Sequence, residues 1–166
     1  MITSETYIKN KNRITSMHEL LTNPLNYFTP LGNGEVLDDV EDFNYVEGAI
    51  ILKINNVSML GFQHWDLVDQ LWVYLITSVE QLIDGKQYFS FYFPDQPLKF
   101  EIKAISSTLL LVSVDGKTCI VDRNEFFTQI LEDARHFFFV LKGVSDTQQK
   151  QFNTLLDRIS NIFERR

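Results

Sequence analysis

A histidine and an aspartate stand close together at His64 and Asp66, and this pairing raises the question of catalysis. A histidine beside a carboxylate can exchange protons or bind a metal, so the two residues suggest an acid–base site. Asp69 follows three residues after Asp66, at the predicted start of a helix, where carboxylates cap free amide groups. Capping explains both aspartates, and an enzyme that uses His64 with Asp66 stays an alternative.

The other reactive side chains do not form a known catalytic pattern. The single cysteine, Cys119, lies in a strand-like stretch and is predicted to be a small buried residue. His18 and His136 show no recognised metal-ligand spacing. The segment "LGNGEV", residues 31–36, has neither the length nor the lysine of a phosphate-binding loop. We therefore expect no catalytic residue, no metal and no cofactor.

Acidic residues are concentrated in one short segment. The net charge is −7, and residues 35–47 contribute six acidic residues without any Lys or Arg. These residues are Glu35, Asp38, Asp39, Glu41, Asp42 and Glu47. They lack the alternating spacing and central glycine of a calcium loop. A solvated loop is the simplest interpretation, and a docking surface for a basic partner is the functional one, whereas nucleic acid phosphates would be repelled.

Composition predicts one folded domain over residues 1–166. Hydrophobic residues make up 45% of the chain and include 14 Phe, which is enough for an aromatic-rich core. The polar N-terminal sequence lacks the apolar stretch of a secretion signal, and the longest apolar runs are too short to span a membrane. A single cysteine forms no internal disulfide. We expect a cytoplasmic protein with neither a membrane nor a nucleic acid as its partner.

Turn residues predict two β-hairpins, at residues 49–62 and 108–121. Asn55-Asn56 would close the first hairpin, because asparagine tolerates positive φ angles, and Asp115-Gly116 would close the second. The expected cross-strand pairs are Ile54–Val57, Leu52–Met59, Val112–Cys119 and Leu110–Val121. The link before residue 108 is ambiguous by one position, so Leu109 to Val112 receive no face assignment.

A third hairpin is predicted at residues 87–105, around "YFPDQP" at residues 92–97. Its two prolines resemble a groove-binding Pro-x-x-Pro ligand, but that mode needs an extended segment. A loop at residues 94–97 gives one register that separates apolar from polar residues. The apolar pairs are Phe91–Phe100 and Phe89–Ile102, and the polar pairs are Tyr92–Lys99, Ser90–Glu101 and Tyr88–Lys103. The segment is therefore a turn, and Tyr88 and Tyr92 are candidate contact residues on the polar face.

Helical spacing of apolar residues predicts one helix at 65–84 and a C-terminal helix pair at 123–142 and 146–165. Asp122 and Glu125 form a predicted capping box before the first helix of the pair, and residues 145–148 form another before the second. Prolines and glycines interrupt residues 1–46, which we expect to be mostly irregular. The predicted fold class is α+β, with an antiparallel sheet of about six strands.

Two segments carry a resemblance to known sequences. "WDLVDQLW" at residues 65–72 and "FPDQP" at residues 93–97, followed by a strand, a "VDG" turn and two Phe-rich helices, resemble a family of small uncharacterised bacterial proteins. The resemblance covers residues 48–141 and implies no activity, so it assigns no catalytic residue. In size, acidity and fold class the chain is also similar to immunity proteins, which neutralise toxins.

Together these features favour a non-enzymatic, immunity-like protein-binding module. It would dock a basic partner through the acidic segment, residues 35–47, with Tyr88 and Tyr92 as a further contact surface. The alternatives are an enzyme with a site near His64 and Asp66, and a small-ligand-binding or self-associating structural protein. In the last case helices would cover one sheet face and the other face would associate.

Overall fold

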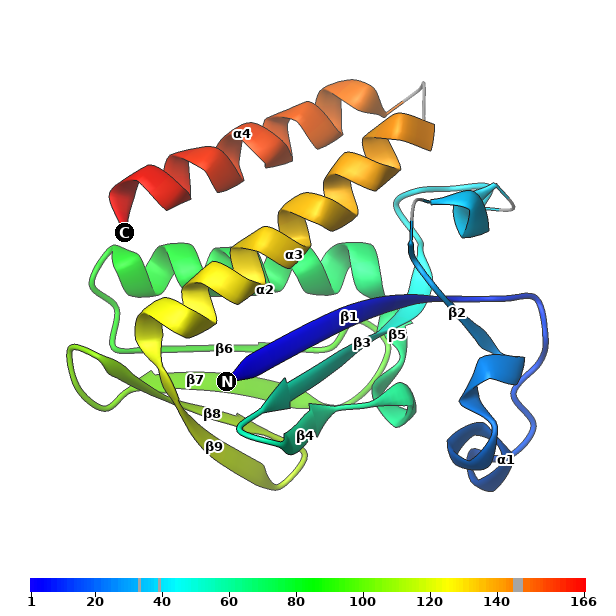
Figure 1. The fold of residues 1–166 in the computed structure, drawn as a ribbon, viewed down its shortest axis with the longest axis horizontal. Helices are drawn as coiled ribbons and strands as arrows, with labels where there is room; N and C mark the ends of the chain where they lie inside the picture. Colours follow the sequence, from blue (N-terminus) through cyan, green and yellow to red (C-terminus); the bar gives the residue numbers. More distant parts are fainter. Residues whose placement is uncertain (33, 39, 145–147) are drawn as a thin grey trace.

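Two antiparallel sheets lie beneath a layer of helices in the computed structural model, which describes residues 1–32, 34–38, 40–144 and 148–166 (Figure 1). The first sheet has the order β2-β1-β3-β4, with β5 also paired to β3, and the second has the order β6-β7-β8-β9. The strands of the first sheet are β1 (Ile2–Lys9), β2 (Phe28–Pro30), β3 (Glu47–Ile54), β4 (Val57–Leu60) and β5 (Asp66–Leu67). Those of the second are β6 (Tyr88–Tyr92), β7 (Lys99–Ala104), β8 (Leu109–Val114) and β9 (Lys117–Asp122).

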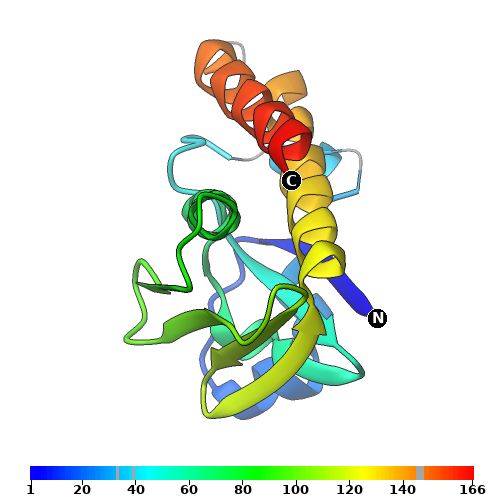
Figure 2. The ribbon, with the colours of Figure 1, turned by 90° about the vertical axis from the view of Figure 1, so that its left-hand side faces the viewer.

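The long helices pack on one side of the sheets. Figure 2 shows α2 end-on between the second sheet and the C-terminal helix pair. The helices are α1 (Met17–Thr22), α2 (Val68–Ile83), α3 (Arg123–Val144) and α4 (Gln149–Arg165), and short 3₁₀ turns are η1 (Pro24–Asn26), η2 (Glu35–Leu37) and η3 (Phe62–His64). The α+β class, the antiparallel strands and the C-terminal helix pair are as predicted. The expected single sheet of about six strands is corrected to two sheets, of five and four strands.

One large core fills the space between the sheets and the helices. Trp72 of α2, Phe100 of β7 and Phe126 of α3 are fully buried in it. Each such side chain contributes about 1.5–3 kcal/mol relative to exposure. A smaller cluster beneath α1 contains Leu20 and Phe28. The aromatic-rich composition is therefore used mainly for packing.

The predicted hairpin registers are confirmed in the second sheet. Phe91 pairs with Phe100 and Tyr92 with Lys99, and the Asp115-Gly116 turn has φ angles of 50° and 71°. In β8, Leu110 and Val112 are buried whereas Leu109 is exposed, which assigns the faces that the sequence left open.

The first hairpin turns where predicted but differs in register. Asn55 and Asn56 have φ angles of 49° and 67°, and Ile54 pairs with Val57. A β-bulge then places Leu52 opposite Leu60 instead of Met59. Met59 and Leu60 are both buried, and a bulge lets two consecutive side chains leave the simple alternation of a strand.

The expectation that residues 1–46 are mostly irregular missed β1, which lies between β2 and β3. Its inward positions alternate regularly, but two of them are polar. Ser4 donates a hydrogen bond to the Asp133 carboxylate of α3, and Thr6 accepts one from the buried Trp72 indole at 3.1 Å. Side chains of α2 and α3 thus form hydrogen bonds with these two polar residues, which interrupt the apolar alternation that would have predicted the strand.

Helix starts also differ from the prediction. Residues 65–67 precede α2, and Asp66 lies in β5, so Asp66 does not cap the helix. At the next predicted cap, the Glu125 amide donates to Asp122 at 2.9 Å, as expected. The Glu125 carboxylate instead accepts from the Ile2 amide, which ties β1 to α3. Of the second predicted capping box, at residues 145–148, residues 145–147 lie outside the described residues, and Gln148 is the N-cap of α4 without a side-chain capping hydrogen bond.

Candidate functional site

The acidic segment is held in place by apolar residues that alternate with its carboxylates. Leu37 and Val46 are buried, and Val36, Val40 and Phe43 pack partly buried against the main core. The charged residues between them point to solvent because their neighbours point inward. Exposed carboxylates are Glu35, Asp38, Glu41, Asp42 and Glu47, and the remaining predicted site residue, Asp39, lies outside the described residues.

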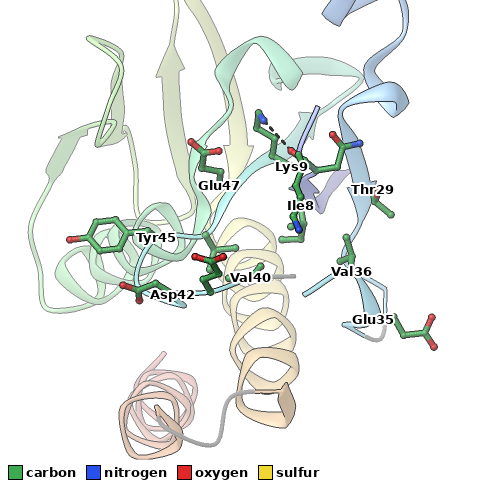
Figure 3. A pocket seen from close by; sticks show the side chains of 13 residues that line it. Ile8, Lys9, Thr29, Glu35, Val36, Val40, Asp42, Tyr45 and Glu47 are labelled. Atoms are coloured by element: carbon green, nitrogen blue, oxygen red, sulfur yellow. Dashed lines mark hydrogen bonds between the residues drawn. The ribbon is translucent and has the colours of Figure 1, made fainter. Parts of the chain in front are cut away.

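Four of these carboxylates line a hollow of about 720 Å³, which we call the acidic hollow (Figure 3). Its lining residues are Ile8, Lys9, Asn10, Lys11, Thr29, Glu35, Val36, Val40, Glu41, Asp42, Tyr45, Val46 and Glu47. Asp42, Tyr45 and Glu47 lie on one side, and Glu35 lies on the other. Asp38 is exposed but does not line the hollow. The site thus combines an apolar floor with a carboxylate-rich rim.

A lysine of the hollow is engaged away from the carboxylates. The Lys9 ammonium donates to the backbone oxygens of Asn10 at 3.0 Å and Asn12 at 3.1 Å. It also lies 5.8 Å from the centre of the Trp65 ring, within the range of a cation–π contact. Four carboxylates therefore face two lysines, and the hollow is negative overall.

Asp69 of α2 anchors the acidic segment from below. Its carboxylate accepts a hydrogen bond from the Val46 amide at 3.0 Å, between the rim residues Tyr45 and Glu47. Burial raises the pKa of Asp69 to about 6, and the negative charge of nearby Asp42 adds to the rise, against the lowering effect of the amide bonds. Asp69 is thus a structural support of the hollow.

Asp66 has a similar supporting role for the "PDQP" loop. Its carboxylate is buried, accepts from the Leu67 amide at 2.7 Å, and accepts from the Asp95 amide at 3.1 and 3.2 Å. Burial raises the pKa of Asp66. Gln96 adds a side-chain bond of 2.5 Å to the Trp65 carbonyl. The Pro-x-x-Pro segment is therefore a loop docked on its own chain.

His64 is buried and has other partners than Asp66. Its Nδ1 accepts from the Gly61 amide at 3.0 Å, which leaves the proton of a neutral ring on Nε2. Nε2 then donates to the Asp115 carboxylate at 2.9 Å. Within the described part of the chain, no hydrogen bond joins His64 to Asp66. The histidine links the η3 turn to the β8–β9 turn, and the suggested His64–Asp66 pair does not form.

Tyr88 and Tyr92 lie on the outer face of the second sheet, away from the acidic hollow. Their side chains are 46% and 63% exposed. The Tyr88 hydroxyl donates to Glu101 at 2.5 Å and accepts from Lys99 at 3.0 Å. Hydrogen bonds from Lys99 and Tyr88 lower the pKa of Glu101. The predicted contact residues therefore fall on two separate surfaces, and self-association through the sheet face stays a prediction.

The prediction from the sequence did not include several residues that line the hollow. Tyr45 is 64% exposed beside the carboxylates, and Val36 and Val40 form part of the floor. An exposed aromatic residue within an acidic, valine-interrupted segment was the available signal. No cluster of three or more His, Cys, Asp or Glu suited to a metal is found among the described residues.

Comparisons with protein-family models, curated proteins and solved structures found no match for this chain. The resemblance to a small bacterial family and to immunity proteins stays a prediction. In the part of the chain that the structure describes, no helix is long and apolar enough to cross a membrane.

Proposed function

We propose that the protein is a non-enzymatic binding module that docks a basic protein partner in the acidic hollow. The observation that carries the proposal is the gathering of Glu35, Glu41, Asp42 and Glu47 around an apolar floor in a hollow of about 720 Å³. Negative potential of this kind attracts positive partners and speeds their association. An apolar centre with a charged rim is also the usual composition of a protein interface.

Arginine and lysine side chains match both parts of the hollow. Their aliphatic stems pack on Val36 and Val40, while their charged ends reach the carboxylates of the rim. Tyr45 adds a ring face, which contributes about 0.5–1 kcal/mol to an exposed cation. Single exposed ion pairs contribute about 0–1 kcal/mol, so the partner must place several bases in the hollow at once.

We propose that this binding neutralises the partner, as immunity proteins neutralise toxins. The net charge of −7 suits a protein that neutralises a basic toxin by occupying its surface. Neutralisation of this type needs affinity and fast association, and it needs no catalytic residue in the inhibitor. The acidic hollow supplies the charge, and its apolar floor supplies contact area.

Selection from a random-peptide library tests the proposal. Wild-type protein should enrich peptides rich in Arg and Lys, and the binding of these peptides should weaken as salt rises. The triple substitution Glu41→Gln, Asp42→Asn and Glu47→Gln should reduce affinity about 3- to 150-fold, since it removes three ion pairs of about 0.2–1 kcal/mol each. These carboxylates are exposed, so the fold should be retained.

A variant with the same change in net charge serves as the control. Glu132→Gln, Asp157→Asn and Glu164→Gln neutralise three exposed carboxylates on α3 and α4, outside the hollow. This control should bind the selected peptides nearly as well as wild type. The proposal is wrong if no basic peptide is enriched, or if both triple variants bind equally.

A further inference from the structure

A groove between α2 and α4 opens next to the acidic hollow. Its wider part, of about 620 Å³, is lined by Val73 of α2 together with residues of α4 and the preceding Gln148. A second part, of about 340 Å³, is lined by Phe43, Tyr74 and Leu155 among others. Val73, Gln151 and Leu155 line both parts, so the two cavities form one groove.

Among the described residues, the side-chain hydrogen bonds that join α4 to α2 lie in the C-terminal half of each helix. Near their C-terminal ends, Glu80 of α2 accepts from Arg158 at 2.6 Å and from Arg165 at 3.0 Å. Toward the start of α4 the two helices diverge, as both Figure 1 and Figure 2 show. Val73 and Leu155 lie in this divergent region and stay partly exposed.

Tyr45 connects the groove to the acidic hollow, because its side chain lines both. The two sites therefore adjoin along one surface, with apolar side chains on the α2–α4 side and carboxylates on the other. Lys150, at the start of α4, lines the wider part of the groove and disfavours a cation there. A ligand that covers both sites needs an apolar group between the helices and basic groups beyond Tyr45.

We propose that the groove receives a large apolar side chain of the same basic polypeptide segment that fills the acidic hollow. This inference rests on the proposed function and specifies its partner as a segment with an aromatic or long aliphatic residue next to several bases. Charge complementarity selects this occupant. A second copy of this chain would bring the same acidic hollow and a net charge of −7, so like charges would oppose it.

Two pairs of probe peptides test the inference. All the peptides alternate Arg and Gly. In one pair the test peptide carries Phe at its N-terminus, in the other pair at its C-terminus, and in both pairs the second peptide has Ala in place of Phe. Fluorescence anisotropy should show about tenfold tighter binding of one Phe peptide than of its Ala counterpart, as expected for an anchor residue in an apolar groove. Val73→Thr should remove most of this preference without changing the salt dependence.

Val57→Thr is the matched control, since Val57 is 39% exposed on β4 and lies outside the groove. It should keep the full preference for Phe. Equal binding of the Phe and Ala peptides, or a preference that Val73→Thr leaves intact, would overturn the inference while the proposed function stands. If the triple variant Glu41→Gln, Asp42→Asn and Glu47→Gln binds every peptide as wild type does, the proposed function fails as well. A dimer in sedimentation velocity that Val73→Thr dissociates would assign the groove to a second copy and refute the inference.

Discussion

Substituting Asp69 by Asn should change how pH affects the stability of this protein. Asp69 is 8% exposed, and its carboxylate accepts the Val46 amide at 3.0 Å. Burial raises its pKa from 3.8 to about 6, with a smaller contribution from the charge of Asp42. Asparagine keeps a side-chain oxygen of similar position but does not titrate, so the substitution isolates the ionisation of this one group.

The sign of the effect follows from where the proton is held. Below pH 3.8 the carboxyl is protonated in the folded and the unfolded chain, and between 3.8 and about 6 only the folded chain keeps the proton. The protonated Asp69 side chain therefore makes its full contribution to the free energy of unfolding at low pH, and this contribution is lost as pH rises through about 6. A difference of about two pKa units corresponds to about 3 kcal/mol in the free energy of unfolding.

Urea denaturation of both proteins across this pH range measures the effect. The stability of wild type relative to Asp69→Asn should fall by about 3 kcal/mol from the acidic to the neutral end, because the other titrating groups are common to both proteins and cancel in the difference. Asp157→Asn, at an exposed position of α4, is the control for the loss of one carboxylate elsewhere in the chain. A flat difference for Asp69→Asn would refute the burial argument.

Two further predictions concern packing around β1. Thr6→Val removes the hydrogen-bond acceptor of the buried Trp72 indole, so urea denaturation should show a free energy of unfolding lower by about 1–3 kcal/mol. Thr3→Val, at an exposed position of the same strand, should change it little. Similar losses in the two variants would contradict the hydrogen-bond argument. Gly48→Ala should destabilise by about 3 kcal/mol, because its Cβ would lie 2.2 Å from a backbone oxygen of β1. Gly143→Ala in α3 should stabilise by about 0.5–1 kcal/mol, because among the described residues the added Cβ meets no atom of another element within 4 Å. Thermal denaturation that ranked the two alanine variants in the opposite order would contradict this.

Local patterns predicted the elements whose partners are close in the sequence. In the 87–105 hairpin, alternation of Phe with polar residues determined the register, and the turn lies where Pro94 begins it. The Asp115-Gly116 turn was equally clear, since glycine accepts a positive φ. In such hairpins the contacting residues lie within about 20 positions of one another, so a local sequence pattern can predict them.

Features that depend on distant partners were not predictable in this way. β1 pairs with residues of β3 that lie 40 to 52 positions later, and its polar inward residues find their hydrogen-bond partners on α2 and α3. His64 bonds to Asp115, 51 positions away, so its proximity to Asp66 in the sequence was misleading. The carboxylates of the acidic segment were identified from the sequence, but the hollow they surround depends on how Val46 is held by Asp69.

The attachment of α4 gives Glu80 an influence beyond its own contacts. Both Arg158 and Arg165 reach this one carboxylate, and Arg165 also pairs with Asp84 at 2.8 Å. These ion pairs hold α4 against α2 beside the part of the groove that Val73 and Leu155 line. Glu80 lines neither part of the groove, so a substitution at Glu80 would alter how α4 is held without changing any lining residue.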